Sequence, residues 1–293
     1  MKHFSIILAL AAVLAVSGCA APQKAAQSAQ TSPHSVSRRF PPVDQKGNIA
    51  IVAHRGFWNC EAGGYSENSI ASLKAAQDAG LWGSECDIHI TADDVIIVNH
   101  DATIEGKKIA THDFADFAGA LLPNGERRPT LDEYLAQAAG CKTTKLIIEL
   151  KPQSAEARED VLVSKAIDAL KAFDLYNPQR VLFISFSRHI CDVIAEKHPQ
   201  FVNQFLSTNF TKNENPEIYA NRGINGVDYH YKMFSIKPSY VEKAHELGMS
   251  VNAWTVDKDA DIREMVKVGV DAITSNNPLL VREILGNKEF KNK

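Results

Sequence analysis

The sequence lacks the features that mark several common classes of protein. Its 32 basic and 35 acidic residues are spread along the chain without a basic stripe or an acidic tail, so nucleic acid is a poor candidate partner. No two of its five cysteines lie two to four residues apart, which excludes the usual zinc-binding spacings. Hydrophobic residues make up 45% and charged residues 23% of the chain, which is an ordinary globular balance.

The N-terminal segment has the features of an export signal. A short basic start precedes residues 4–18, an uncharged run of fifteen residues that is too short to span a bilayer about 30 Å thick as a helix. The residues before Cys19 resemble a bacterial lipobox, in which cleavage leaves an acylated N-terminal cysteine. We therefore predict a lipoprotein signal peptide at residues 1–18, with anchoring through Cys19 in the bacterial cell envelope, in the periplasm or at the cell surface. The alternative is an ordinary secreted protein with a chance cysteine.

Residues 19–46 follow as a segment rich in Ala, Gln, Ser and Pro without an apolar period. This composition predicts a lipidated cysteine and a flexible tether. The remaining residues, 47–293, are long enough for one large domain.

Short apolar runs alternate with stretches of helical period in this domain. The runs of strand length are 49–53, 85–90, 146–150, 181–186, 201–206, 226–229, 249–254 and 270–274. Helical patterns cover 69–79, 131–139, 155–173, 188–197, 238–247 and 259–268. The alternation predicts a parallel sheet, and the number of strands favours a (β/α)8 TIM barrel over an open doubly wound sheet. No G-x-G-x-x-G fingerprint follows the first strand, which argues against a dinucleotide site.

One stretch breaks this alternation. After the extended run 95–98, residues 101–128 show no clear unit of their own. We predict that they form a short loop insertion after the second strand. Loops without their own units in compact domains are usually functional, so we place it on the active face of the barrel.

Acidic residues lie inside two of the predicted strands. Glu85 and Asp87 are two residues apart, so both side chains point to the barrel interior, and Glu149 lies near the carboxyl end of the next barrel strand. Carboxylates in such a place repel one another and lose hydration unless a cation compensates. A hard divalent ion, Mg²⁺ or Ca²⁺, fits three carboxylates better than zinc does. The alternative is a buried ion network with Lys151.

The strand ends also carry basic and titratable groups. His54 and Arg55 close the first strand, His100 follows the extended run, and Lys151 shares a face with Glu149. A metal with Arg55 and Lys151 could neutralise a phosphodiester, and two imidazoles with near-neutral pKa could act as base and acid. The set therefore indicates phosphate-transfer chemistry.

The motifs at these positions resemble those of the glycerophosphodiester phosphodiesterases, a family of phospholipase-C-like barrels. The matching segments are His54-Arg55-Gly56, Glu67-Asn68-Ser69, Glu85-Cys86-Asp87, His100-Asp101, Glu149-Leu150-Lys151, Ser185-Phe186, Trp254-Thr255-Val256 and Gly269-Val270-Asp271. They occur in the family's order over residues 49–285. The segment after Asp101 departs from the family's usual pattern.

The resemblance implies a role for each matched site residue. Glu85, Asp87 and Glu149 would hold the divalent metal, and His54 and His100 would be the catalytic pair. Arg55 and Lys151 would contact phosphate, and Trp254 would pack against the alcohol.

The implied activity is metal-dependent hydrolysis of a glycerophosphodiester to an alcohol and glycerol 3-phosphate, by a phosphoric diester hydrolase. One alternative is a phospholipase-C-like lipase that gives a cyclic phosphate, and another is a non-catalytic surface binding lipoprotein.

Four further segments also bear on the site, and two of them keep two interpretations each. Trp254 is a substrate platform or a core residue, and Glu67 with Asn68 caps a helix or supports the site. Residues 229–232 could line the barrel mouth. Asn276 and Asn277 indicate a turn into the last helix.

Overall fold

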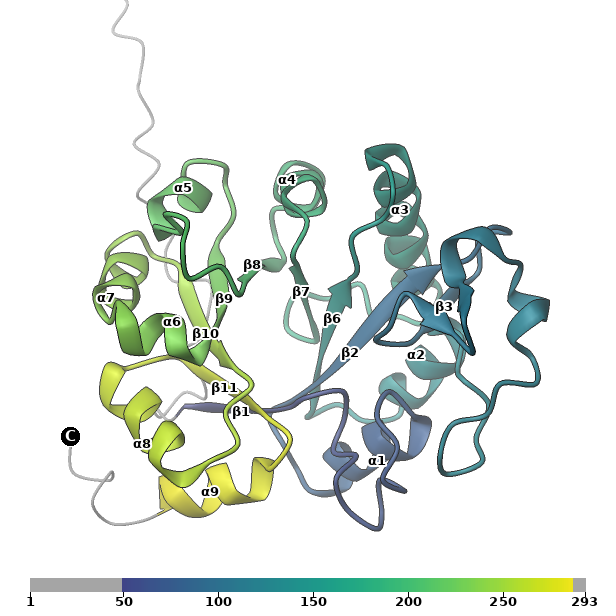
Figure 1. Cartoon of the computed structure of the whole chain (residues 1–293), viewed down its shortest axis with the longest axis horizontal. Coiled ribbons are helices and arrows are strands. Elements are labelled where there is room, and N and C mark those ends of the chain that lie inside the picture. Colours follow the sequence, from purple (N-terminus) through teal and green to yellow (C-terminus); the bar gives the residue numbers. More distant parts are fainter. Residues whose placement is uncertain (1–48, 287–293) are drawn as a thin grey trace, which may run out of the picture. The chain divides into compact units, whose positions relative to one another are not determined.

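Eight parallel strands form a closed barrel in this computed structural model, which describes residues 49–286 (Figure 1). The strands are β1 (Ala50–Ala53), β2 (Gly83–Ile90), β6 (Lys145–Leu150), β7 (Val181–Ser185), β8 (Val202–Ser207), β9 (Gly226–His230), β10 (Ser250–Trp254) and β11 (Ala272–Ser275). Strand β1 pairs with both β2 and β11, which closes the sheet. The predicted (β/α)8 barrel is confirmed.

Helices surround the barrel on its outer side (Figure 1). They are α1 (Ile70–Asp78), α2 (Leu131–Ala139), α3 (Glu156–Ala172), α4 (Arg188–Lys197), α5 (Pro216–Ala220), α6 (Tyr231–Ile236), α7 (Ser239–Glu246), α8 (Asp259–Val268) and α9 (Pro278–Gly286). The sequence did not predict α5 and α6, because helices of five and six residues are too short to show a helical period.

Local sequence sets where several of these helices begin and end. The hydroxyls of Ser69, Thr130 and Ser187 accept hydrogen bonds from backbone N–H groups in the first turns of α1, α2 and α4. Helix α8 ends at Gly269, whose φ of 90° lies in the left-handed region that glycine adopts without strain.

The alternation of side chains along each strand separates an apolar outer layer from a mixed interior. Cys86 and Ile88 point outward and pack in a large buried cluster beneath the helices, as predicted. A second cluster continues this layer around β9 and β10. Glu85 and Asp87 therefore point into the barrel.

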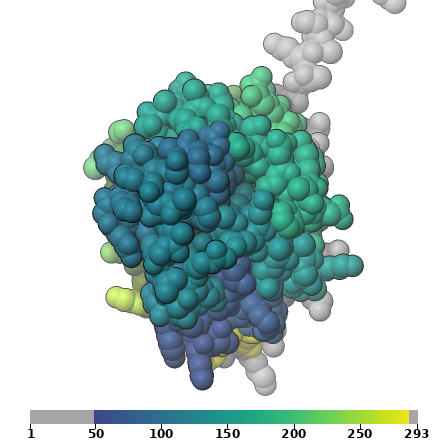
Figure 2. Space-filling model, turned by 90° about the vertical axis from the view of Figure 1, so that its right-hand side faces the viewer, coloured from purple at the N-terminus to yellow at the C-terminus, as the bar shows by residue number. Residues whose placement is uncertain are grey.

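The insertion after β2 has more structure than the sequence predicted. Strand β3 (Ile96–Val98) pairs antiparallel with β2. It is followed by a hairpin of β4 (Thr103–Ile104) and β5 (Lys107–Lys108) and by the 3₁₀ helices η1 (Ile109–Thr111) and η2 (Phe114–Phe117). Figure 2 shows this blue to teal segment covering one side of the barrel. The predicted insertion after the second strand is confirmed, but its small elements were not predicted, because elements of two to four residues leave no periodic signal.

The insertion has a small core of its own. Its buried members are Ile97, Ile104, Ile109, Phe117 and Ala120. These side chains anchor the segment on which His100 and Asp101 lie.

Several predictions fall outside the barrel. The signal peptide at residues 1–18, the tether at 19–46 and Cys19 lie outside the described residues.

Within residues 49–286, no helix has both the length and the apolar character needed to cross a membrane. Cys60, Cys86, Cys141 and Cys191 are free thiols.

Candidate active site

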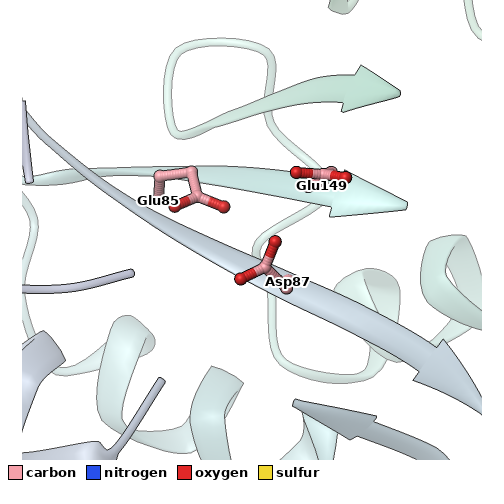
Figure 3. A group of neighbouring side chains, drawn as sticks. All are labelled: Glu85, Asp87 and Glu149. Carbon is pink, nitrogen blue, oxygen red and sulfur yellow. The ribbon is translucent and has the colours of Figure 1, made fainter. Parts of the chain in front are cut away.

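Three carboxylates meet inside the barrel at the predicted metal position. Strands β2 and β6 are neighbours, with Asp87 opposite Glu149. One oxygen from each of Glu85, Asp87 and Glu149 lies within 4.8 Å of the others. Figure 3 shows the three side chains close together over these two strands. All three residues are buried.

Two cationic side chains contact this carboxylate group, but neither one satisfies Glu85. Lys151 Nζ lies 2.7 Å from both Asp87 Oδ1 and Glu149 Oε1, and Arg55 Nε lies 3.8 Å from Asp87 Oδ2. Glu85 Oε2 accepts a hydrogen bond from the Arg55 backbone N–H at 2.7 Å, whereas its Oε1 is buried without a partner. The alternative of an ion network with Lys151 thus accounts for two of the three carboxylates.

The electrostatics of the three carboxyls differ. Burial and the neighbouring carboxyls raise the pKa of Glu85 and raise that of Glu149 to about 8. Burial acts in the same direction on Asp87, but Lys151 and Asn68 outweigh it and hold its pKa below the ordinary value. The group needs further positive charge to be fully ionised at neutral pH. An all-oxygen donor set with one unpartnered buried oxygen suits a hard divalent cation.

His54 lies at the carboxyl end of β1 and is held by Asn276 across the barrel closure. Its Nδ1 lies 2.9 Å from Asn276 Oδ1. That oxygen also accepts from Trp58 Nε1 at 3.1 Å, and the Asn276 amide N–H donates to Asp257 Oδ2 at 2.8 Å. Since the indole N–H can only donate, Asn276 must present its oxygen, so His54 Nδ1 carries the proton. His54 Nε2 is then free to accept one.

The pKa of His54 differs from the near-neutral value predicted. Burial and the adjacent Arg55 lower it to about 4. The imidazole is therefore uncharged at neutral pH, as a proton acceptor must be.

His100 lies at the other predicted position, just after β3. Its Nδ1 is 2.8 Å from Asp101 Oδ1, and its side chain is about one-third exposed. A carboxylate at this distance orients the ring.

One cavity of about 130 Å³ brings the predicted residues together. Its lining includes His54, Arg55, Glu85, His100, Glu149, Lys151 and Trp254. Asp87 lies next to two of these lining residues, Glu85 and Glu149, in the carboxylate group. An apolar wall is added by Ile184 on β7, Phe186 just after it and Leu206 on β8. The cavity therefore has a charged side and an apolar side, as a phosphodiester with a carbon skeleton requires.

Asn68 and Glu67 support the site rather than cap α1. Asn68 Nδ2 donates to Asp87 Oδ2 at 2.8 Å, and its Oδ1 accepts from the Asp87 backbone N–H at 3.1 Å. Glu67 Oε2 accepts from Arg55 at 2.8 Å. The cap of α1 is Ser69, so the capping interpretation of Glu67 and Asn68 was wrong. Their place before the first barrel helix, in the loop that follows β1, was the available signal.

Asn276 and Asp257 are site residues that the sequence analysis missed. Asn276 does lie in the turn before α9, as predicted, but it also orients His54. Its position directly after the last barrel strand was the signal, because that end of the barrel faces the site.

At β9 the cavity-lining residue is not in the predicted segment 229–232. Asp228 lines the cavity, whereas Tyr229 points outward into a buried aromatic cluster. Successive strand residues face opposite sides, so His230 returns to the side of Asp228, where its ring packs against Trp254 at a centroid distance of 5.8 Å. A place for residues 229–232 at the barrel mouth stays a prediction. Trp254 lines the cavity too, with its Nε1 donating to the Asp228 carbonyl at 3.0 Å. This position favours the substrate-platform interpretation over the core one.

Comparisons with known proteins identify the family of this chain. The model of the glycerophosphoryl diester phosphodiesterase family matches residues 54–280. The chain is 28% identical over 241 residues to a glycerophosphodiester phosphodiesterase of Caldanaerobacter subterraneus subsp. tengcongensis, which covers 78% of this chain and 94% of that protein.

Solved structures show the same fold. A glycerophosphodiester phosphodiesterase from Parabacteroides distasonis has a TM-score of 0.77 and 36% identity, covering 81% of this chain and 97% of that one. An Oleispira antarctica phosphodiesterase in complex with sn-glycerol-3-phosphate has a TM-score of 0.68 and 21% identity, covering 82% and 98%. Because the family model spans most of the chain and a solved relative shares 36% identity over 81% of it, the chain belongs to the glycerophosphoryl diester phosphodiesterase family and is a hydrolase of phosphodiesters.

Proposed function

We propose that this protein hydrolyses glycerophosphodiesters to an alcohol and glycerol 3-phosphate, with a divalent cation and a pair of histidines. The observation that carries the proposal is the single cavity onto which His54, His100, Arg55, Lys151 and the carboxylate group converge. The Oleispira relative, whose structure contains sn-glycerol-3-phosphate, supports the choice of product.

Glu85, Asp87 and Glu149 would hold the cation, which we expect to be Mg²⁺ or Ca²⁺. When bound, it supplies positive charge that polarises a phosphoryl oxygen and offsets the charge of the transition state. Asn68 fixes the orientation of Asp87 through two hydrogen bonds. Such outer contacts commonly change metal affinity or activity by about 10-fold to 100-fold.

Arg55 and Lys151 bind the phosphate. Lys151 contacts two carboxylates at 2.7 Å and also lines the cavity, so its ammonium can share its donors with a phosphoryl oxygen. Arg55 lines the cavity, and its guanidinium is held by Glu67 at 2.8 Å and lies 3.8 Å from Asp87. These cations contribute most where charge redistributes during reaction.

The two histidines divide the proton transfers. His54 has an unprotonated Nε2 and a low pKa, so it takes the proton of the attacking nucleophile. His100, oriented by Asp101, gives a proton to the departing alkoxide. The nucleophile is water for direct hydrolysis, or a substrate hydroxyl for the cyclic phosphate.

Product analysis on the full-length protein tests this function. Glycerophosphodiesters should release glycerol 3-phosphate, which ³¹P NMR separates from a cyclic phosphate. Excess chelator should abolish release and Mg²⁺ or Ca²⁺ should restore it, and Glu149→Gln should weaken metal affinity by about 10-fold or more. Full activity in excess chelator would contradict the metal assignment. Binding of glycerophosphodiesters without any turnover would support a binding lipoprotein instead.

The acid role of His100 has its own test. His100→Ala should lose about 10²-fold or more on a glycerophosphodiester with an ordinary alcohol, because an alkoxide leaves poorly without a proton. With nitrophenol as leaving group the loss should be much smaller. Equal losses on both substrates would indicate a positioning role.

We also propose that the protein is exported and anchored to a membrane through Cys19. The support is the apolar run 4–18, which ends in Val16-Ser17-Gly18 directly before the cysteine. Cys19→Ser should move the protein from the membrane fraction to the soluble fraction and remove labelling by a fatty acid. Unchanged membrane association would contradict the anchor.

A further inference from the structure

Asp228 is a buried carboxyl in the cavity that the mechanism above does not use. It lies in β9, is 1% exposed, and lines the cavity with its side chain facing the barrel interior. Its Oδ1 has no hydrogen-bond partner. A buried carboxyl oxygen without a partner is costly in a folded protein, so a polar group of a ligand is expected to meet it.

Neither the metal site nor an ion pair explains Asp228. Among the described residues, the carboxylate oxygens that converge within 4.8 Å come from Glu85, Asp87 and Glu149 and do not include Asp228. The ion pairs found within residues 49–286 do not include it either. The side chain of Asn252, opposite Asp228 on β10, hydrogen bonds to its carboxyl.

The surroundings of Asp228 combine apolar and polar groups and suit a carbon chain that carries hydroxyl groups. In the sheet, Leu206 on β8 and Asn252 on β10 lie opposite Asp228. Trp254, whose Nε1 donates to the Asp228 carbonyl, lines the same cavity as Leu206. Burial raises the pKa of Asp228 to about 8, so the carboxyl is mostly uncharged at neutral pH and does not repel a phosphate nearby. An uncharged carboxyl both donates and accepts, which matches a hydroxyl group.

The position of Asp228 in the barrel indicates which half of the substrate it faces. Strand β9 is four positions from β2 in the ring of eight strands, so it lies across the barrel. His100 lies on the β2 side, beyond β3. If the departing alcohol is near His100, the other ester arm of the phosphate extends toward β9. That arm is the glycerol that stays on phosphorus.

We propose that Asp228 selects the glycerol half of the substrate by hydrogen bonding to one of its hydroxyl groups. This inference rests on the proposed function and deepens it, because it names the residue that distinguishes a glycerol ester from a simple alkyl ester. A site built to pair with a substrate hydroxyl rejects analogues that lack it, since its own polar group is then left unpartnered.

Two nitrophenyl phosphodiesters test the proposal, one with glycerol and one with propyl as the retained arm. The leaving group is the same, so their ratio of kcat/KM measures recognition of the hydroxyls. The wild-type protein should prefer the glycerol ester by about 10²-fold. Asp228→Leu and Asp228→Ala should reduce this preference by about 10-fold or more, mainly by loss on the glycerol ester. Asp228→Asn, which still donates and accepts, should keep part of the preference.

Glu159→Gln is the matched control, because Glu159 is a buried acid on α3 whose carboxylate binds Ser187 and the Gln153 backbone. It should leave the preference at the wild-type value. An unchanged preference in both Asp228→Ala and Asp228→Leu would overturn the proposal. Weaker metal binding in Asp228→Asn, measured by calorimetry, would also overturn it, by placing Asp228 in the metal site.

A binding measurement separates this proposal from the proposed function. Calorimetry with glycerol 3-phosphate and propyl phosphate needs no turnover, and Asp228→Ala should remove the difference in affinity between the two. If the wild-type protein has no activity but shows this difference, the hydrolase assignment fails and the role of Asp228 stands. If the wild-type protein is active but binds both phosphates with equal affinity, the hydrolase assignment stands and the role of Asp228 fails.

Discussion

Asn276 shows how a single side chain can fix the chemistry of another. Its amide oxygen accepts from both His54 and Trp58, and its amide nitrogen donates to Asp257. These contacts hold the proton of His54 on Nδ1 and leave Nε2 as the proton acceptor of a ring that lines the cavity. Asn276 is thus a positioning residue for the candidate base.

Asn276→Leu should lower kcat by about 10-fold to 100-fold with a smaller change in KM, because the proton of His54 is no longer held on Nδ1. Steady-state kinetics on a glycerophosphodiester would measure this. The control is Asn277→Ala, whose side-chain oxygen accepts from Asn59 at the surface and which should retain activity. Equal losses in both variants would point to damage to the turn.

The pKa of His54 also predicts the acidic limb of the activity profile. Burial lowers this pKa to about 4, and only the unprotonated ring accepts a proton. At saturating metal, kcat/KM should therefore hold as pH falls from 7 to about 5 and decline below that. A decline centred near pH 6.5 would assign that limb to a different group.

Among the larger elements, the insertion between β2 and α2 carries one half of the proposed histidine pair. Its small core includes Ile104, Ile109 and Phe117. Arg128, near the C-terminal end of the insertion, donates from Nε to Asn99 Oδ1 at 2.9 Å, next to His100. The insertion therefore positions the acid through its own packing, although it adds no strand to the barrel.

Phe117→Ala should destabilise the protein by about 3 kcal/mol, because it leaves a cavity in a small core, and should lower kcat through His100. Denaturant unfolding and kinetics would measure both effects. Phe210→Ala removes a half-exposed ring elsewhere and should cost less than about 1 kcal/mol. A destabilised Phe117→Ala with full kcat would show that this core does not position His100.

The whole molecule depends on closure of the barrel around a tightly packed interior. A Cβ at Gly226 would lie 2.4 Å from Ser250 Oγ and 2.6 Å from Gln204 Cγ. These two side chains hydrogen bond to each other at 2.8 Å inside the barrel. Glycine is required here because the neighbouring strands bring polar side chains against its backbone.

Gly226→Ala should therefore destabilise the protein by about 1 to 3 kcal/mol, because Gln204 and Ser250 must move and their hydrogen bond is strained. Gly119→Ala is the control, since a Cβ there meets no atom within 4 Å. It should change the free energy of unfolding by less than about 0.5 kcal/mol. Similar stability of the two variants would contradict the packing argument.

The sequence by itself determined the barrel and most of the charged site. Strand and helix periods are local, so eight strands and six helices could be located from them. Glu85, Asp87 and Glu149 could be assigned to the interior because side chains alternate along a strand and parallel strands end on one face. The same local patterns could not detect α5, α6 or the small elements of the insertion.

The tertiary structure alone decided which distant residues complete the site. His54 and Asn276 are 222 residues apart, and closure between β1 and β11 brings them within hydrogen-bond distance. Asp228 became a candidate because its buried Oδ1 has no hydrogen-bond partner and the residue lines the cavity. A periodic sequence pattern cannot show whether a buried atom has a partner. Contacts of this kind depend on the order and stagger of strands around the barrel, which a one-dimensional pattern does not contain.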